Sequence, residues 1–242
     1  MYWRNPLSAV FSFAFPVMFL LIFGSANANA RPKELGGSTK FIQYYLPSIL
    51  AFGLLSVCFT NLAINLCTRR DLGMLKRKRG TPLPAWGMIG GLLANAFIVS
   101  VALVALVTAL GMVIFGVHVY VGRLPALALT LLLGAVTGCS LGVAASTFVP
   151  NAEAAPAVIN AMLFPLVFIS GTFFPISAHS TLSKIANVFP VKHFIDGTFA
   201  AFDPRSHGNG FSGKNMAILA VWAAVGLVLA VRRFRWEPKR VG

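Results

Sequence analysis

Long apolar runs dominate the chain, and short basic or polar segments separate them. A helix that crosses a bilayer needs about 20 mostly apolar residues, because the hydrocarbon core is about 30 Å thick. The sequence therefore predicts an all-α integral membrane protein with six transmembrane helices. The predicted spans are approximately residues 7–23, 41–66, 86–115, 124–148, 157–174 and 216–231.

The first apolar run has two interpretations. It ends in Ser25-Ala26-Asn27-Ala28-Asn29-Ala30, whose small residues resemble a signal-peptidase site. The apolar core of a secretory signal is about 7–15 residues long, whereas this run is longer and rich in Phe. We expect a first span rather than a cleaved signal.

Composition supports the membrane assignment. Hydrophobic residues make up 57% of the 242 residues and charged residues only 11%, which is too little charge to cover a water-facing surface. The net charge of +14 resides mostly in segments between apolar runs, so membrane lipids are the expected partner and nucleic acid is not. Cys58, Cys67 and Cys139 lack metal-binding spacing and are expected to be small core residues.

The basic residues also predict an orientation. Of the 20 Lys and Arg, 12 lie at position 4 and in segments 69–79 and 232–240, on the side of the N-terminus. Basic flanks face the cytoplasm, so both termini of this multi-pass protein of the cell membrane are predicted to be cytoplasmic. The histidines would then lie on the outer side, at His118, His179, His193 and His207.

The segment between the second and third spans contains a short basic amphipathic helix. Leu72 and Leu75 are three residues apart and share a helix face, basic residues surround them, and Gly80 with Pro82 stops the helix. Such a helix either lies on anionic headgroups or docks onto a soluble partner. Its amphipathicity favours neither.

Three motifs, in order, resemble the ABC-2 type transporter permeases, and the drug-resistance (daunorubicin-type) export permeases among them. Asp71-Leu72-Gly73-Met74-Leu75-Lys76-Arg77-Lys78-Arg79-Gly80-Thr81-Pro82-Leu83-Pro84 resembles the family's loop signature. The family's entry to the first span resembles the start of this chain, Tyr2-Trp3-Arg4-Asn5-Pro6 followed by Phe13-Ala14-Phe15-Pro16. Its fifth span and outer hairpin resemble Ser170-Gly171-Thr172-Phe173-Phe174-Pro175-Ile176-Ser177, with Phe189-Pro190 downstream. The resemblance covers nearly the whole chain and implies a single transmembrane domain over residues 1–242.

The chain departs from the family pattern in three places. Only about six residues precede the first span, where the family usually has an amphipathic helix. Met74 stands where Thr is common, and Asp71 stands where Glu is frequent.

The resemblance implies that segment 68–84 is a cytoplasmic coupling helix that fits a cleft in ABC ATPase subunits. The residues expected to form it are Arg70, Asp71, Leu72, Gly73, Met74, Leu75, Lys76, Arg77, Arg79, Thr81 and Pro82. Asp71 either pairs with a basic residue of the ATPase or is an acid favoured by the dipole at a helix N-terminus. A second permease, identical or paralogous, is implied as a further partner.

One motif imitates a nucleotide site. Residues 208–215 nearly match G-x-x-x-x-G-K-[ST], but Asn215 stands where the Mg²⁺ ligand belongs, and a predicted span follows. We expect no cofactor on this chain, with ATP and Mg²⁺ bound by the partner ATPase.

Small and polar residues inside the spans have structural and functional interpretations. Gly134, Gly138 and Gly142 indicate close helix packing within one protomer or at a dimer seam. The candidate substrate pathway comprises Asn61, Asn65, Asn95, Asn160, Phe164 and Phe168, although hydrogen bonds between helices are the favoured interpretation of the asparagines. Short re-entrant or interfacial helices are expected in segment 175–213, after an outer hairpin containing Gly171, Phe174, Pro175 and Pro190.

We predict a permease subunit that exports a hydrophobic or amphipathic substrate, a drug or a lipid, by alternating access. The predicted spans contain no Asp, Glu, Lys, Arg or His, which disfavours an ATP-independent secondary carrier or channel. A lipid-modifying membrane enzyme that uses His179, His193, Asp196 and Asp203 is the remaining alternative, although their spacing matches no catalytic pattern.

Overall fold

Helices make up the regular structure of the described chain. The computed structural model describes residues 6–27, 30–32, 40–74, 85–173, 180–205 and 208–233. Within these ranges every regular element is helical, which confirms the predicted all-α class. The elements are α1 (Pro6–Asn27), α2 (Phe41–Leu55), η3 (Ser56–Asn61), α3 (Leu62–Asp71), α5 (Ala85–Phe115), η4 (Val121–Arg123), α6 (Leu124–Ser146), α7 (Ala155–Ile169), α8 (Thr181–Ala186), α9 (Pro190–Phe202) and α10 (Gly213–Arg233).

Four helical stretches of the described residues are long and apolar enough to cross a membrane. They are Phe41–Asp71, Gly90–Phe115, Val121–Ser146 and Gly213–Arg233. Two shorter apolar stretches, Phe13–Asn27 and Ala155–Ile169, lie where the first and fifth spans are predicted. The protein is therefore a multi-pass membrane protein, and the prediction of six spans goes beyond these four.

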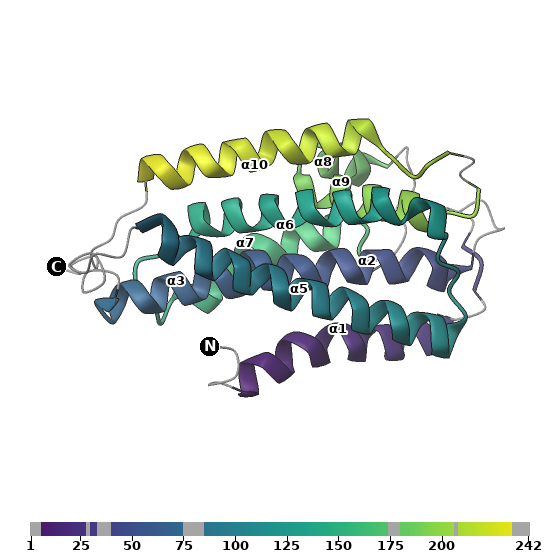
Figure 1. Cartoon of the computed structure of the whole chain (residues 1–242), viewed down its shortest axis with the longest axis horizontal. Coiled ribbons are helices and arrows are strands. Elements are labelled where there is room, and N and C mark those ends of the chain that lie inside the picture. Colours follow the sequence, from purple (N-terminus) through teal and green to yellow (C-terminus); the bar gives the residue numbers. More distant parts are fainter. Residues whose placement is uncertain are drawn as a thin grey trace.

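The helices form an elongated bundle around α2. Figure 1 shows α10 along one long edge and α1 along the other, with α2, α3, α5 and α6 between them. All fifteen residues of α2 are buried. A helix that is apolar all round belongs in the interior, and α2 contacts α1, α5, α6 and α9. The beginning of α1 and the end of α10 lie at the same end of the bundle, which we call the terminal end (Figure 1).

A wide turn interrupts this central helix without breaking it. Residues Ser56–Asn61 form a π-helix, η3, between α2 and α3. A π-helix pairs residues five apart and is found mostly as a single turn inside α-helices. Helix α6 crosses η3 closely: a Cβ atom on Gly142 would lie 2.8 Å from the carbonyl oxygen of Phe59.

The glycines of α6 face the same chain. A Cβ atom on Gly134 would lie 2.2 Å from the Phe194 ring, and one on Gly138 would lie 3.0 Å from the Cys58 Cβ. On α10, a Cβ atom on Gly226 would lie 2.9 Å from the backbone nitrogen of Leu141. These glycines therefore let helices of one protomer approach closely, in agreement with the first of the two interpretations drawn from their spacing.

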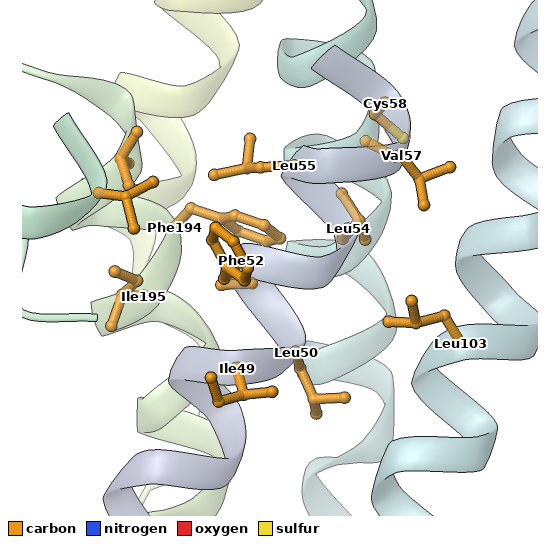
Figure 2. Packing of buried hydrophobic residues seen from close by; sticks show 14 of the residues in the cluster. Ile49, Leu50, Phe52, Leu54, Leu55, Val57, Cys58, Leu103, Phe194 and Ile195 are labelled. Atoms are coloured by element: carbon orange, nitrogen blue, oxygen red, sulfur yellow. The ribbon is translucent and has the colours of Figure 1, made fainter. Parts of the chain in front are cut away.

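Helix α9 is inserted among the long helices. Pro190 occupies its first turn, where a missing N–H leaves no hydrogen bond unmade. Phe194 and Ile195 of α9 are each 1% exposed, and Phe194 lies beside Phe52 of α2 (Figure 2). Since Phe194 also packs on Gly134, ten residues into α6, α9 reaches well into the bundle from the end opposite the termini.

Helix α7 ends earlier than the sequence predicts. The predicted fifth span extends to residue 174, whereas α7 ends at Ile169. Gly171 has a φ of 81°, a left-handed conformation that glycine adopts without steric cost. Its carbonyl oxygen accepts a 2.6 Å hydrogen bond from the Tyr44 hydroxyl of α2. The turn is therefore held by the central helix.

At the end opposite the termini, one amide side chain joins three elements. Gln43 of α2 donates to the carbonyl oxygens of His118 (2.8 Å) and Phe202 (2.9 Å), and it accepts from the backbone N–H of His118 (3.2 Å). With 8% exposure, the amide is shielded from water. It thereby fixes the start of α2 to the α5–η4 loop and to the end of α9.

We expect Gln43→Leu to destabilise the protein by roughly 2–4 kcal/mol, because it leaves three buried backbone groups unsatisfied. The measurement is the apparent melting temperature in mild detergent. Asn65→Leu is the matched control, since the exposed Asn65 amide hydrogen-bonds only its own helix, to the carbonyl oxygen of Asn61 at 2.8 Å. Equal stability of the two variants would contradict a joining role for Gln43.

Candidate functional site

The terminal end of α3 carries the first residues of the predicted coupling segment. The N–H groups of Leu72 and Gly73 donate to the carbonyl oxygens of Thr68 and Arg70, both at 3.0 Å. Gly73 has a φ of 65°, the left-handed conformation that commonly terminates helices. The Leu72 side chain beside it is 62% exposed. An apolar side chain is thus presented at the terminal end of the bundle.

Most of the predicted coupling segment lies outside the described residues. Met74 is the last described residue before the gap. Those that fall outside are Leu75, Lys76, Arg77, Arg79, Thr81 and Pro82.

Arg70 is buried and holds the end of α6. Its guanidinium donates to the carbonyl oxygens of Ser146 (3.1 Å), Val149 (2.8 Å) and, more weakly, Pro150 (3.4 Å). The residue is only 4% exposed. The last carbonyls of a helix lack intrahelical donors and carry partial negative charge, so a buried cation is stabilised there. The structure thus places Arg70 inside the protein, engaged with backbone, rather than on a docking surface.

Asp71 binds the other side of the same turn. Its Oδ2 atom accepts the backbone N–H of Ala152, and its Oδ1 atom lies 3.6 Å from the Arg70 Nε. Asp71 is the last residue of α3, and Ala152 lies three residues before α7 begins. The carboxylate therefore lies near the start of α7 rather than at the N-terminus of its own helix.

Together these two side chains connect three helices. Arg70 hydrogen-bonds the end of α6, and Asp71 hydrogen-bonds the loop that leads into α7. Both residues belong to the last turn of α3. We call this arrangement the α3 lock. The sequence indicates both residues but not their hydrogen-bond partners in segment 146–152. Those partners are backbone groups, which every residue has, so no sequence motif marks them.

The candidate pathway residues are distributed over η3, α3, α5 and α7. Asn95 and Asn160 are half-buried, as is Asn61, while Asn65 is exposed. Phe164 and Phe168 are 41% and 64% exposed on α7. None of these six residues lines either of two cavities that the described residues form.

Those cavities lie elsewhere. One is an apolar groove of about 560 Å³ between α5, α6 and α10. The other holds only about 40 Å³ and is lined mainly by α6, α7 and α9, with single residues from α2, η3 and α10. Neither was predicted from the sequence, because each depends on several elements that are distant along the chain.

The outer hairpin is described in part. Gly171 forms the turn after α7, and Pro190 is buried at the start of α9. Phe174 and Pro175 lie outside the described residues.

The acidic and histidine side chains considered for an enzyme are engaged separately. His193 lies 2.8 Å from both the Asn187 carbonyl oxygen and the Asn215 side chain. Asp196 pairs with Lys192 and Asp203 with Arg205, and His179 is outside the described residues. In the part of the chain that the structure describes, no group of three or more His, Cys, Asp or Glu could hold a metal ion.

Comparison with known families agrees with the motifs. A sequence model of the ABC-2 type transporter family matches residues 1–202, which span α1 to α9. A search of curated proteins finds no match. The permeases of this family are the transmembrane components of ABC exporters and generally work with ATPase subunits. Since the match extends over most of its length, the chain belongs to the ABC-2 type transporter family.

Proposed function

We propose that this chain is the permease subunit of an ATP-binding cassette exporter, with six spans and both termini in the cytoplasm. In this proposal α1 forms the first crossing of the membrane, and α7 together with α8 and α9 forms the fifth. An even number of crossings is consistent with α1 beginning and α10 ending at the same end of the bundle (Figure 1). A second permease completes the pathway, and a separate ATPase pair binds ATP and Mg²⁺.

The observation that carries the proposal is the α3 lock beside the exposed Leu72. A coupling element must present a contact to its partner and be joined rigidly to the helices that move. Leu72 offers an apolar contact at 62% exposure, and the basic segment that follows offers charge complementarity. Arg70 and Asp71 connect that contact to α6 and α7. A displacement of the segment after α3 would therefore move α3, α6 and α7 together.

The apolar composition of the bundle supports a hydrophobic or amphipathic substrate. The predicted spans contain no ionisable side chain of the kind that ion-coupled carriers use. On α7, which belongs to the fifth span, Phe164 and Phe168 expose their rings. In this proposal ATP binding closes the ATPase pair, the permeases tilt, and the substrate leaves by alternating access.

Copurification with an ATPase tests the proposal. We expect Leu72→Asp to reduce the ATPase recovered with the tagged permease from native membranes by at least about tenfold, because a charge replaces the central apolar contact of a docking element. The apparent melting temperature should stay unchanged, since Leu72 is exposed.

Val121→Asp is the matched control for this experiment. Val121 is 76% exposed in η4, at the end of the bundle opposite the termini. Recovery of the ATPase should be unaffected there. If wild-type membranes yield no ATPase in mild detergent at low salt, or if both variants lose it equally, the coupling role is wrong.

A further inference from the structure

The groove between α5, α6 and α10 has a lining suited to hydrocarbon. Leu93 and Phe97 of α5, Val136 and Val143 of α6, and Leu227 and Val231 of α10 face it. The hydroxyl of Ser140, which also lines it, donates to the Thr137 carbonyl oxygen of its own helix (3.0 Å). The described lining is therefore almost entirely apolar, which favours an apolar occupant.

Its dimensions match an acyl chain in one leaflet. The α6 lining extends from Ala135 to Val143, which is about 12 Å along the helix axis. One leaflet of the hydrocarbon core is about 15 Å deep. The volume of about 560 Å³ falls in the ordinary range for small-ligand sites. In a bilayer such a space is filled, because an empty one forfeits the contacts of every atom that lines it.

The mouth of the groove is positively charged. On α10 the lining ends at Val231, and Arg232 and Arg233 follow as exposed residues at the last turn. The Arg233 guanidinium lies 5.5 Å from the centre of the Phe148 ring, just beyond the end of α6. Basic side chains beside a groove between helices are suited to an anionic headgroup.

Charge also argues against a second copy of the chain as the occupant. Arg232 and Arg233 are exposed on the last turn of α10, directly after the lining residue Val231. Two copies meeting along this groove would bring like charges together at its mouth, which disfavours the contact. Anionic phospholipid satisfies both the apolar lining and the basic mouth.

We propose that this groove is a binding site for one anionic phospholipid of the leaflet at the terminal end, cytoplasmic in the orientation proposed above. One acyl chain lies between α5, α6 and α10, and the phosphate lies at Arg232 and Arg233. The site needs only the placement of the bundle in a membrane. It does not depend on an ATPase partner, so either proposal can fail without the other.

Native mass spectrometry of the purified full chain tests the site. The chain is mixed in detergent with equal amounts of palmitoyl-oleoyl phosphatidylglycerol and phosphatidylcholine. We expect one retained lipid per chain, with phosphatidylglycerol favoured by about tenfold or more. Arg232→Gln with Arg233→Gln should bring that preference close to unity. Lys214→Gln, which removes an exposed charge at the opposite end of α10, should leave it unchanged.

A second pair of variants tests the acyl-chain part of the groove. Ala94→Phe fills the groove from α5 and should abolish retention of either lipid. Ala102→Phe is the control, because the exposed Ala102 lies about 140° around the helix from Phe97 and faces elsewhere. Equal retention of the two lipids, no retained lipid, or an unchanged preference in the arginine variant would overturn the proposal. So would an Ala94→Phe variant that dissociates a dimer, since the occupant would then be a second copy.

Discussion

Replacing Arg70 by alanine is expected to destabilise the protein by about 3–5 kcal/mol, the range for removing one partner of a buried charged contact. The loss removes the donors to the Ser146, Val149 and Pro150 carbonyl oxygens and leaves the Asp71 carboxylate without its neighbour. For a chain of this size we expect the apparent melting temperature in detergent to fall by about 10 °C or more.

Two variants define the cause of that loss. Arg70→Lys keeps the charge but cannot reach several carbonyls at once, so its melting temperature should lie between those of wild type and Arg70→Ala. Lys214→Ala removes an exposed charge and should change little. If Arg70→Ala melts like wild type, then the α3 lock does not hold α6 and α7, and the transmission path proposed for coupling loses its support.

Gly142→Ala is expected to be the most damaging of the small substitutions on α6, at about 2–3 kcal/mol, because the added Cβ meets backbone rather than a movable side chain. The new atom would lie 2.8 Å from the Phe59 carbonyl oxygen and 3.1 Å from that of Cys58. Relief requires α6 and η3 to move apart, which also shifts the neighbouring packing. The measurement is again thermal unfolding in detergent.

Gly91→Ala provides a control of opposite sign. A Cβ atom on Gly91 of α5 has no neighbour within 4 Å. Alanine favours a helix interior over glycine by up to about 1 kcal/mol, so this variant should be as stable as wild type or more so. A Gly142→Ala variant that matches Gly91→Ala would show that α6 and η3 are not in close contact.

Apolar patterning accounts for most of what the sequence could predict about the fold. Runs such as 41–66 and 86–115 predict long helices because a spanning helix must satisfy its backbone internally whatever it packs against. The end of α7 could not be predicted in the same way. Pro175 is a strong local stop signal, but the tertiary hydrogen bond from Tyr44 to Gly171 lies at an earlier turn.

The candidate site was predicted only as a sequence position. The motif around Asp71 directs attention to the end of α3, but charge alone suggests that Arg70 faces a partner. Its burial follows from the carbonyls of Ser146 and Val149, more than 70 residues away, which no local pattern reveals. The groove at Val231 was missed for the same reason, since three helices contribute to it.

The π-helical turn has a consequence for insertions and deletions. A π-turn holds one residue more than an α-turn over about the same rotation, so deleting one residue would let η3 become regular α-helix while α3 keeps nearly its angle relative to α2. Converting η3 to α-helix with all six residues kept would instead rotate α3 by about 100°. Arg70 and Asp71 would swing away from the α6–α7 turn although no contact residue had changed. The π conformation between Leu55 and Leu62 therefore sets the angular register of the end of α3, independently of which side chains occupy it.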